Sequence, residues 1–176
     1  MFGRLFKKIT WTEKTLSNIT EMLPNIEQLS LTSQMVKMSV DRIQETVGKD
    51  ISADSQYCIY SFELGAMQHA LSSLCDLSAF DSQQRFMFII YSIFYNEVKE
   101  NRITSDAQWE VIANDYHRAC NDKYKAFRQF GYDSDIEKSS EQDSSNPSSE
   151  SITIKVIQQL ESSTHLLTKS GSIEKR

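Results

Sequence analysis

The stretch QRFMFIIYSIFYNEV, residues 84–98, raises the question of whether this chain contains a membrane segment, a cofactor site or a buried core helix. Within it, residues 86–95 are apolar except for Ser92. A helix that spans a membrane needs about 20 predominantly apolar residues, and this shorter run has amide or charged side chains at both ends. At helical spacing its apolar side chains point in all directions, which is typical of a helix enclosed by other helices. The run therefore predicts the central helix of a bundle rather than a membrane segment or a cofactor site.

The composition of the whole chain favours one domain built from long helices. Of the 176 residues, 39% are hydrophobic and 24% are charged, which is close to the average for globular proteins. Two prolines and five glycines are too few for the many turns that a fold of short strands requires. We therefore expect an all-α fold, a single bundle of about five helices at residues 11–132.

The charge and the cysteines limit the classes of partner and the compartment. The net charge of −5 provides no concentration of Lys and Arg, so we expect no nucleic-acid partner. Cys58, Cys75 and Cys120 form neither a C-x-x-C motif nor an even set, which argues against a zinc site and a disulfide framework. The first residues lack the pattern of a secretory signal. These features predict a protein of the reducing cytoplasm.

Caps and apolar spacing divide the predicted bundle into five helices. In the third helix, expected at residues 56–77, the pair Gly65-Ala66 predicts that another helix approaches closely. The first helix covers residues 11–23 and ends before Pro24, and the second covers residues 26–47 and ends before Gly48. The third helix is expected at residues 56–77, with Ser52 or Asp54 as its cap. The fourth is expected to run from Asp81 or Ser82 to near Asn101. The fifth is expected to begin at Ser105, in capping-box spacing with Gln108, and to end at Phe130 before Gly131.

The second predicted helix carries a coiled-coil-like stripe. Its residues recur at alternating spacings of three and four, which is the repeat of a heptad. Such a stripe packs inside one bundle or forms the seam of a homodimer. Met35 and Met38 beside it offer an adaptable second contact. The stripe consists of Ile26, Leu29, Ser33, Val36, Val40, Ile43 and Val47.

The composition changes abruptly after the bundle. Residues 133–151, DSDIEKSSEQDSSNPSSES, contain eight serines and six acidic residues. A segment of this kind cannot bury a core, and it predicts a disordered linker. We expect residues 152–170 to form a helix that this linker tethers, free to dock on the bundle or on a partner. Residues 171–176 are expected to be a flexible tail.

The sequence contains no recognisable motif for catalysis or for a cofactor. It lacks a G-x-S-x-G, a Walker loop, a dinucleotide fingerprint and an H-E-x-x-H. His69, His117 and His165 do not follow the Glu-x-x-His pattern of di-iron bundles. Cys120 lies three residues from His117, a spacing that allows contact, but a structural thiol explains it better than a nucleophile. We therefore predict no catalytic residue, no metal ligand and no cofactor.

Residues 1–10 form a basic amphipathic segment. Phe2, Leu5, Phe6 and Ile9 fall on one side of a helix, and the segment carries three positive charges. This pattern is typical of a helix that lies in a membrane interface. The alternative is docking on the bundle with the lysines solvated, which the shortness of the segment favours. The candidate membrane contacts are Phe2, Arg4, Leu5, Phe6, Lys7 and Lys8.

Three functional hypotheses follow from these patterns. The first is a non-enzymatic protein-interaction module, an adaptor, immunity or regulatory protein whose partner binds a groove of the bundle or the tethered C-terminal helix. The second is a small-ligand-binding protein or enzyme with a pocket between the third, fourth and fifth helices, near His69, Tyr91, Tyr95 and His117. The third is a peripheral membrane protein recruited by residues 1–11 to the inner face of a membrane. A polar cleft with a strongly perturbed carboxylate or histidine would count against the first hypothesis.

Overall fold

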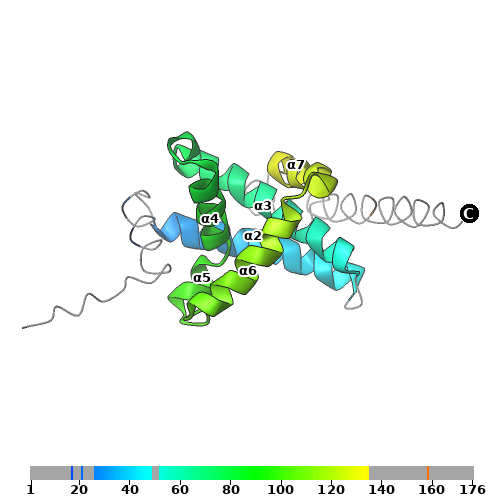
Figure 1. Ribbon diagram of the computed structural model, residues 1–176, viewed down its shortest axis with the longest axis horizontal. Helices are drawn as coiled ribbons and strands as arrows, with labels where there is room; N and C mark the ends of the chain where they lie inside the picture. Colours follow the sequence, from blue (N-terminus) through cyan, green and yellow to red (C-terminus); the bar gives the residue numbers. More distant parts are fainter. Residues whose placement is uncertain (1–16, 18–20, 22–25, 49–51, 135–157, 159–176) are drawn as a thin grey trace, which may run out of the picture.

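The computed structural model describes residues 17, 21, 26–48, 52–134 and 158. The described part is all-α, as the sequence predicts, and its regular elements are helices and two short 3-10 turns (Figure 1). The predicted segment 1–10, most of the first predicted helix (residues 11–23), most of the linker and of the C-terminal helix, and the tail 171–176 lie outside the described residues. Ser17 and Glu21, the described residues of that first helix, are helical. The helices are α2 (Ile26–Val47), α3 (Ala53–Leu74), α4 (Ser82–Ile93), α5 (Tyr95–Lys99), α6 (Asp106–Ala119) and α7 (Lys125–Asp133).

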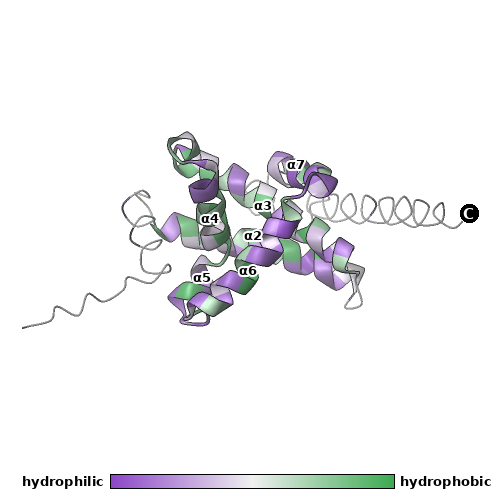
Figure 2. Ribbon diagram, viewed as in Figure 1, coloured by the Kyte–Doolittle hydropathy of each residue, from purple (hydrophilic) through white to green (hydrophobic). Residues whose placement is uncertain are grey.

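The central helix of the bundle is α3. It contacts α2, α4, α6 and α7, and its residues 61–67 are all buried. In Figure 1, α4 and α6 lie across α2 and α3, and α7 lies beside α3. The prediction that residues 84–98 form the central helix is wrong, because α4 buries only its second half, residues 88–93. Polar residues at the start of α4 place its first turn at the edge of the bundle (Figure 2).

No described helix, α4 included, is long and apolar enough to cross a membrane.

The predicted helix caps explain where the main helices begin. Ser52 accepts a hydrogen bond from the backbone N–H of Ser55, so α3 begins three residues earlier than predicted. It ends at Leu74, which is also three residues earlier than predicted. The other two caps form complete capping boxes, Asp81 with Gln84 at α4 and Ser105 with Gln108 at α6.

Two glycines allow α3 and α7 to cross in backbone contact. A Cβ atom on Gly65 would lie 1.8 Å from the carbonyl oxygen of Arg128, and one on Gly131 would lie 2.0 Å from the carbonyl oxygen of Phe62. No larger residue fits at either position without moving a helix. The close approach predicted at Gly65 is confirmed. The prediction that Gly131 ends a helix is wrong, because Gly131 lies inside α7 and serves this contact.

The single helix predicted for residues 105–130 is in fact two helices, α6 and α7, separated by a 3-10 turn. The side chain of Asn121 accepts a hydrogen bond from the backbone N–H of Lys123 at 2.9 Å, and such local bonds compete with a continuing helix. The Lys123 ammonium group also forms an ion pair with Asp54 at the start of α3, with an N–O distance of 2.9 Å. The turn brings both α6 and α7 onto α3.

The helix predicted from Asp81 to near Asn101 also divides into two. Phe94 separates α4 from α5, with φ −98° and ψ 16°. The hydroxyl of Ser92 donates to the carbonyl oxygen of Phe88 one turn earlier, a bond that often bends helices. Asn101 then has φ 57°, in the left-handed region that asparagine tolerates, and ends the segment.

The heptad stripe of α2 faces the interior of this chain. Its middle residues are buried, and α2 contacts α3, α4 and α5. The hydroxyl of Ser33 donates to the carbonyl oxygen of Ile93 at 2.8 Å, which fixes α2 against the end of α4. A homodimer seam along this stripe would require α2 to leave these helices. The buried members are Leu29, Ser33, Val36, Val40 and Ile43.

Candidate functional site

The N-terminal half of α4 forms one wall of a surface groove. The cap at Asp81 fixes the start of this helix. Ser82 and Gln83 in its first turn are exposed, and Phe86 and Met87 in the next turn are half-buried. The first large apolar side chains of α4, Phe86 and Met87, are therefore only partly covered by the core, whereas residues 88–93 are buried in it.

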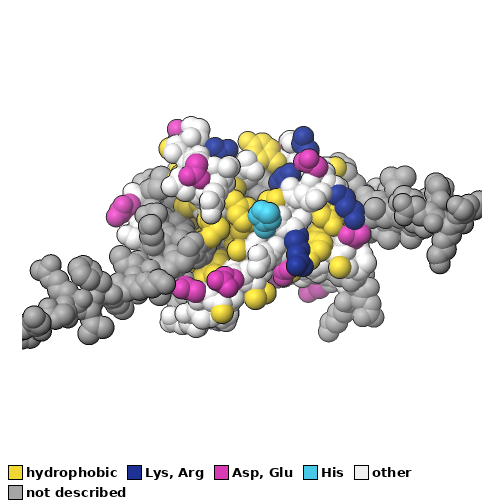
Figure 3. Space-filling model, viewed as in Figure 1, with side chains coloured by type: hydrophobic (Ala, Val, Ile, Leu, Met, Phe, Trp, Pro, Cys, Tyr) yellow, Lys and Arg dark blue, Asp and Glu magenta, His cyan; other side chains and the backbone are white. Residues whose placement is uncertain are grey.

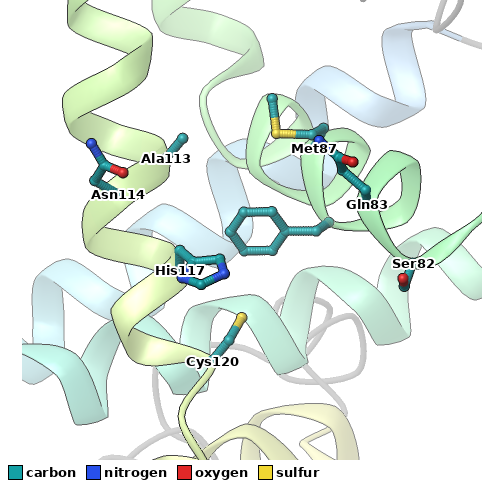
Figure 4. Close-up of a pocket in the computed structure, with 8 residues that line it drawn as sticks. Ser82, Gln83, Met87, Ala113, Asn114, His117 and Cys120 are labelled. Carbon is teal, nitrogen blue, oxygen red and sulfur yellow. The ribbon is translucent and has the colours of Figure 1, made fainter.

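The second wall of the groove is the C-terminal half of α6. Ala113, His117 and Cys120 recur at spacings of four and three, so they share one side of the helix. Figure 4 shows Ala113 and His117 extending from α6 toward α4, with Cys120 at the end of α6. Ala113 and Cys120 are half-buried, whereas Asn114 and His117 are exposed.

The two walls enclose a groove of about 560 Å³. The half-buried lining residues, Phe86, Met87, Ala113 and Cys120, form its apolar base, and the exposed Gln83 and Asn114 lie at its rim. The rings of Phe86 and His117 meet edge to face, with centroids 5.9 Å apart and planes at 87°. On this face of the molecule, hydrophobic side chains gather beside a histidine (Figure 3). A site of this kind accepts an apolar group and orients it by hydrogen bonds at the rim.

The surroundings of Cys120 in the groove are those of a buried thiol. Burial raises the pKa of its thiol, and the nearby charge of Arg128 offsets this shift only in part. A nucleophilic cysteine requires the opposite shift, toward the thiolate. Among the described residues, no three His, Cys, Asp or Glu side chains lie close enough together to hold a metal ion.

A separate polar cluster surrounds the buried carboxyl group of Glu63 on α3. This residue is only 2% exposed. The hydroxyl of Tyr116 on α6 donates a hydrogen bond to Oε2 of Glu63. Nearby, Lys37 of α2 forms an ion pair with Glu97 of α5 at 2.9 Å. Four helices thus contribute charged or hydrogen-bonding groups to one region of the core.

Burial raises the pKa of Glu63 from its ordinary value of 4.5 to about 7. The hydrogen bond from Tyr116 and the charge of Lys37 lower this pKa, whereas the charges of Glu97 and Asp41 raise it. Desolvation has the largest effect, because the ionised carboxylate would lose its water in the core. Glu63 does not line the groove, so this perturbed carboxyl group belongs to the core and not to the groove between α4 and α6.

The structure does not bring the four predicted pocket residues together around the groove. Of these, His117 lines it. His69 is exposed on α3, and its ring lies edge to face with that of Tyr132 on α7, with centroids 5.1 Å apart. Tyr91 and Tyr95 are buried in the core. The predicted membrane contacts, Phe2, Arg4, Leu5, Phe6, Lys7 and Lys8, lie outside the described residues.

Sequence reasoning missed both the apolar base of the groove and the buried carboxyl group. Phe86 and Met87 belong to an apolar run that indicates a core. The signal for their partial exposure is that they lie only five and six residues after Asp81, the cap of α4. Glu63 stands between Phe62 and Leu64 in an apolar part of α3. An acid in such a position must find a hydrogen-bond partner or stay protonated, which marks it for attention.

Comparison of the chain with protein-family models, with curated proteins and with solved structures finds no match. The class that the structure defines is an all-α bundle with an amphipathic surface groove. The function is therefore inferred from the groove.

Proposed function

We propose that this protein is a non-enzymatic interaction module that binds a protein partner through the groove between α4 and α6. The partner class that fits is an amphipathic helix or short peptide, which inserts an apolar side chain between the two helices. The rim residues Gln83 and Asn114 supply hydrogen bonds to the partner backbone or to its polar side chains.

The observation that carries this proposal is the partial exposure of Phe86 and Met87. Full burial of a large apolar side chain contributes about 1.5–3 kcal/mol. A partner that covers the exposed parts of these two side chains therefore gains on the order of 2 kcal/mol. This gain is available without any rearrangement of the core, because neither side chain has to leave its present packing.

Val111 lies on α6 outside the groove. It is 63% exposed and lies three residues before Asn114, so the two side chains are neighbours on the surface of α6. Val111 and Ala113 are two positions apart, so their side chains point about 160° apart around α6 and a partner in the groove does not cover Val111. The apolar contact is therefore confined to the groove, as in interfaces in which a few side chains provide most of the binding energy.

The first experiment places a photo-crosslinking amino acid at Asn114 in the full chain. The matched control places it at Gln129, which is exposed on α7. We expect a partner protein to be captured from position 114 and not from position 129. The captured partner is then produced in pure form, and its affinity for the full chain is measured by calorimetry.

The affinity measurement uses two variants of α6 that carry the same substitution. Ala113→Arg fills the half-buried base of the groove, whereas Ala107→Arg lies on an exposed part of the same helix. We expect Ala113→Arg to weaken binding at least about tenfold, which corresponds to about 1.4 kcal/mol, and Ala107→Arg to bind like the wild type. Equal binding by all three proteins would contradict the proposal. A partner lost only on truncation after Ser134 would assign binding to the predicted C-terminal helix instead.

A small ligand in the same groove is the second candidate, because about 560 Å³ is within the usual size range of ligand pockets. The ε-methyl group of Met87 reports on it directly in a ¹³C NMR spectrum of methyl-labelled protein. A compound that shifts the Met87 signal in the wild type but not in Ala113→Arg would support a ligand site. If only a protein partner shifts this signal, the result supports the proposal that the protein is an interaction module.

A further inference from the structure

The outer side of α2 carries an apolar stripe that no described helix covers. Leu31 is 61% exposed, Met38 is 49% exposed, and Met35 between them is half-buried. The spacings of four and three place the three side chains on one side of the helix over two turns. They point about 200° away from the buried stripe, since each follows a buried residue by two positions.

Acidic side chains lie at both ends of this outer stripe. Glu27 is one turn before Leu31, and Asp41 is one turn after Met38, with Glu45 one turn further on. All three acidic residues are exposed, and Arg42 is the basic residue among them. A partner for the outer stripe must therefore be apolar on one side and carry long basic side chains that reach the acidic residues at the ends of the stripe.

The N-terminal segment of the same chain has this chemistry. Phe2, Leu5, Phe6 and Ile9 recur at helical spacing, and the basic residues Arg4, Lys7 and Lys8 lie between them. From Phe2 to Ile9 is seven residues, the same number as from Leu31 to Met38, and a helix of that span is about 10.5 Å long. The apolar side chains of the segment and of α2 therefore match in length.

We propose that residues 2–9 pack in cis on the outer stripe of α2, antiparallel to it, with their basic side chains beside Glu27 and Asp41. Residues 10–25 connect the segment to α2, and Ser17 and Glu21 among them are helical. Even at a helical rise of about 1.5 Å per residue these 16 residues cover about 24 Å, which is ample for a reversal of direction. The contact uses a different face from the groove between α4 and α6. It does not depend on the proposed function.

The test measures the distance between the amino terminus and the methionine methyl groups of α2 in the full chain. A nitroxide is attached to the α-amino group, which reacts selectively near pH 7 because its pKa of about 8 is well below that of lysine. Methionines carry ¹³C at the ε-methyl position. We expect the label to remove most of the signal of Met38 and Met35 and to affect Met87, in the groove, much less.

A second sample mixes spin-labelled protein without ¹³C and ¹³C-labelled protein without the nitroxide. Unchanged Met35 and Met38 signals in this mixture are expected, because the contact is within one chain. Signal loss in the mixture would overturn the proposal in favour of a second copy. No loss of these signals in the doubly labelled chain would also overturn it, and binding of the label to phosphatidylserine vesicles would then support membrane contact.

Two exposed apolar residues provide matched variants. Leu31→Asp disrupts the outer stripe, and Val111→Asp makes the same change at a site of similar exposure on α6. Neither side chain is part of the core, so both variants are expected to fold. Leu31→Asp should restore the Met35 and Met38 signals at least about twofold relative to the labelled wild type, whereas Val111→Asp should leave them reduced. Equal signals in the two variants would overturn the role of the outer stripe.

Discussion

Replacing Glu63 with glutamine tests whether the core holds a protonated acid. Glutamine has nearly the same size, and its carbonyl oxygen still accepts the hydrogen bond from Tyr116. In the wild type, burial raises the pKa of Glu63 from 4.5 to about 7. The folded state therefore binds more protons than the unfolded state between these pH values, and stability falls as the pH rises through that window. Since one pKa unit corresponds to about 1.4 kcal/mol, ionisation costs about 3 kcal/mol of stability at pH 8.

The assay is urea unfolding of the wild type and Glu63→Gln at pH 5 and pH 8, followed by circular dichroism. Between these two pH values, we expect the wild type to lose about 2–3 kcal/mol more unfolding free energy than the variant. The other titrating groups are common to both proteins, so the difference isolates Glu63. The same pH dependence in both proteins would refute the reasoning, because it would show that burial does not perturb this carboxyl group.

Three further perturbations test the core and the cysteines. Tyr116→Phe removes the donor to the buried carboxyl group, so we expect a loss of about 1–3 kcal/mol in urea unfolding at pH 5. The pH dependence should also become steeper, since that bond lowers the pKa of the acid. Gly65→Ala would bring a Cβ atom 1.8 Å from a backbone oxygen of α7, and we expect it to cost about 3 kcal/mol or more. Gly48→Ala, at φ 90° with no atom within 4 Å, should cost only about 1 kcal/mol in the same assay. Burial raises the pKa of Cys58 to about 11 and also raises that of Cys120. Iodoacetamide should therefore modify both thiols slowly at pH 7 and quickly in urea. Rapid modification of Cys120 in the folded protein would support a role for this cysteine as a nucleophile.

The sequence predicts the helical class and most helix starts because these depend on local chemistry. The hydrogen bonds of a cap such as Ser105 involve residues only three positions apart, so they can be recognised without the fold. The helix ends are different. The turn after α6 depends on Asn121 and on the ion pair of Lys123 with Asp54, a residue 69 positions away in the sequence. A contact of that separation leaves no local pattern.

The candidate site could be predicted only in part for a related reason. The sequence identifies His117 as a candidate because it is a polar residue on a helix with an aromatic stripe. Phe86 and Met87, which line the groove with it, belong to another helix. An apolar run such as residues 86–95 does not show which of its ends lies at the edge of the bundle. That depends on which helix is central. It is α3, which α2, α4, α6 and α7 all contact, and Gly65 lets α7 pack directly on its backbone.

The glycine crossing also constrains the order in which the chain folds. Gly65 and Gly131 are 66 residues apart, and the contact between them closes a loop that contains α4, α5 and α6. Closing so long a loop costs conformational entropy before the new contacts compensate for it. With nine residues, α7 is too short to be a stable helix by itself. We therefore expect α7 to dock late in folding and to open first, so that its amide hydrogens exchange with solvent faster than those of α3.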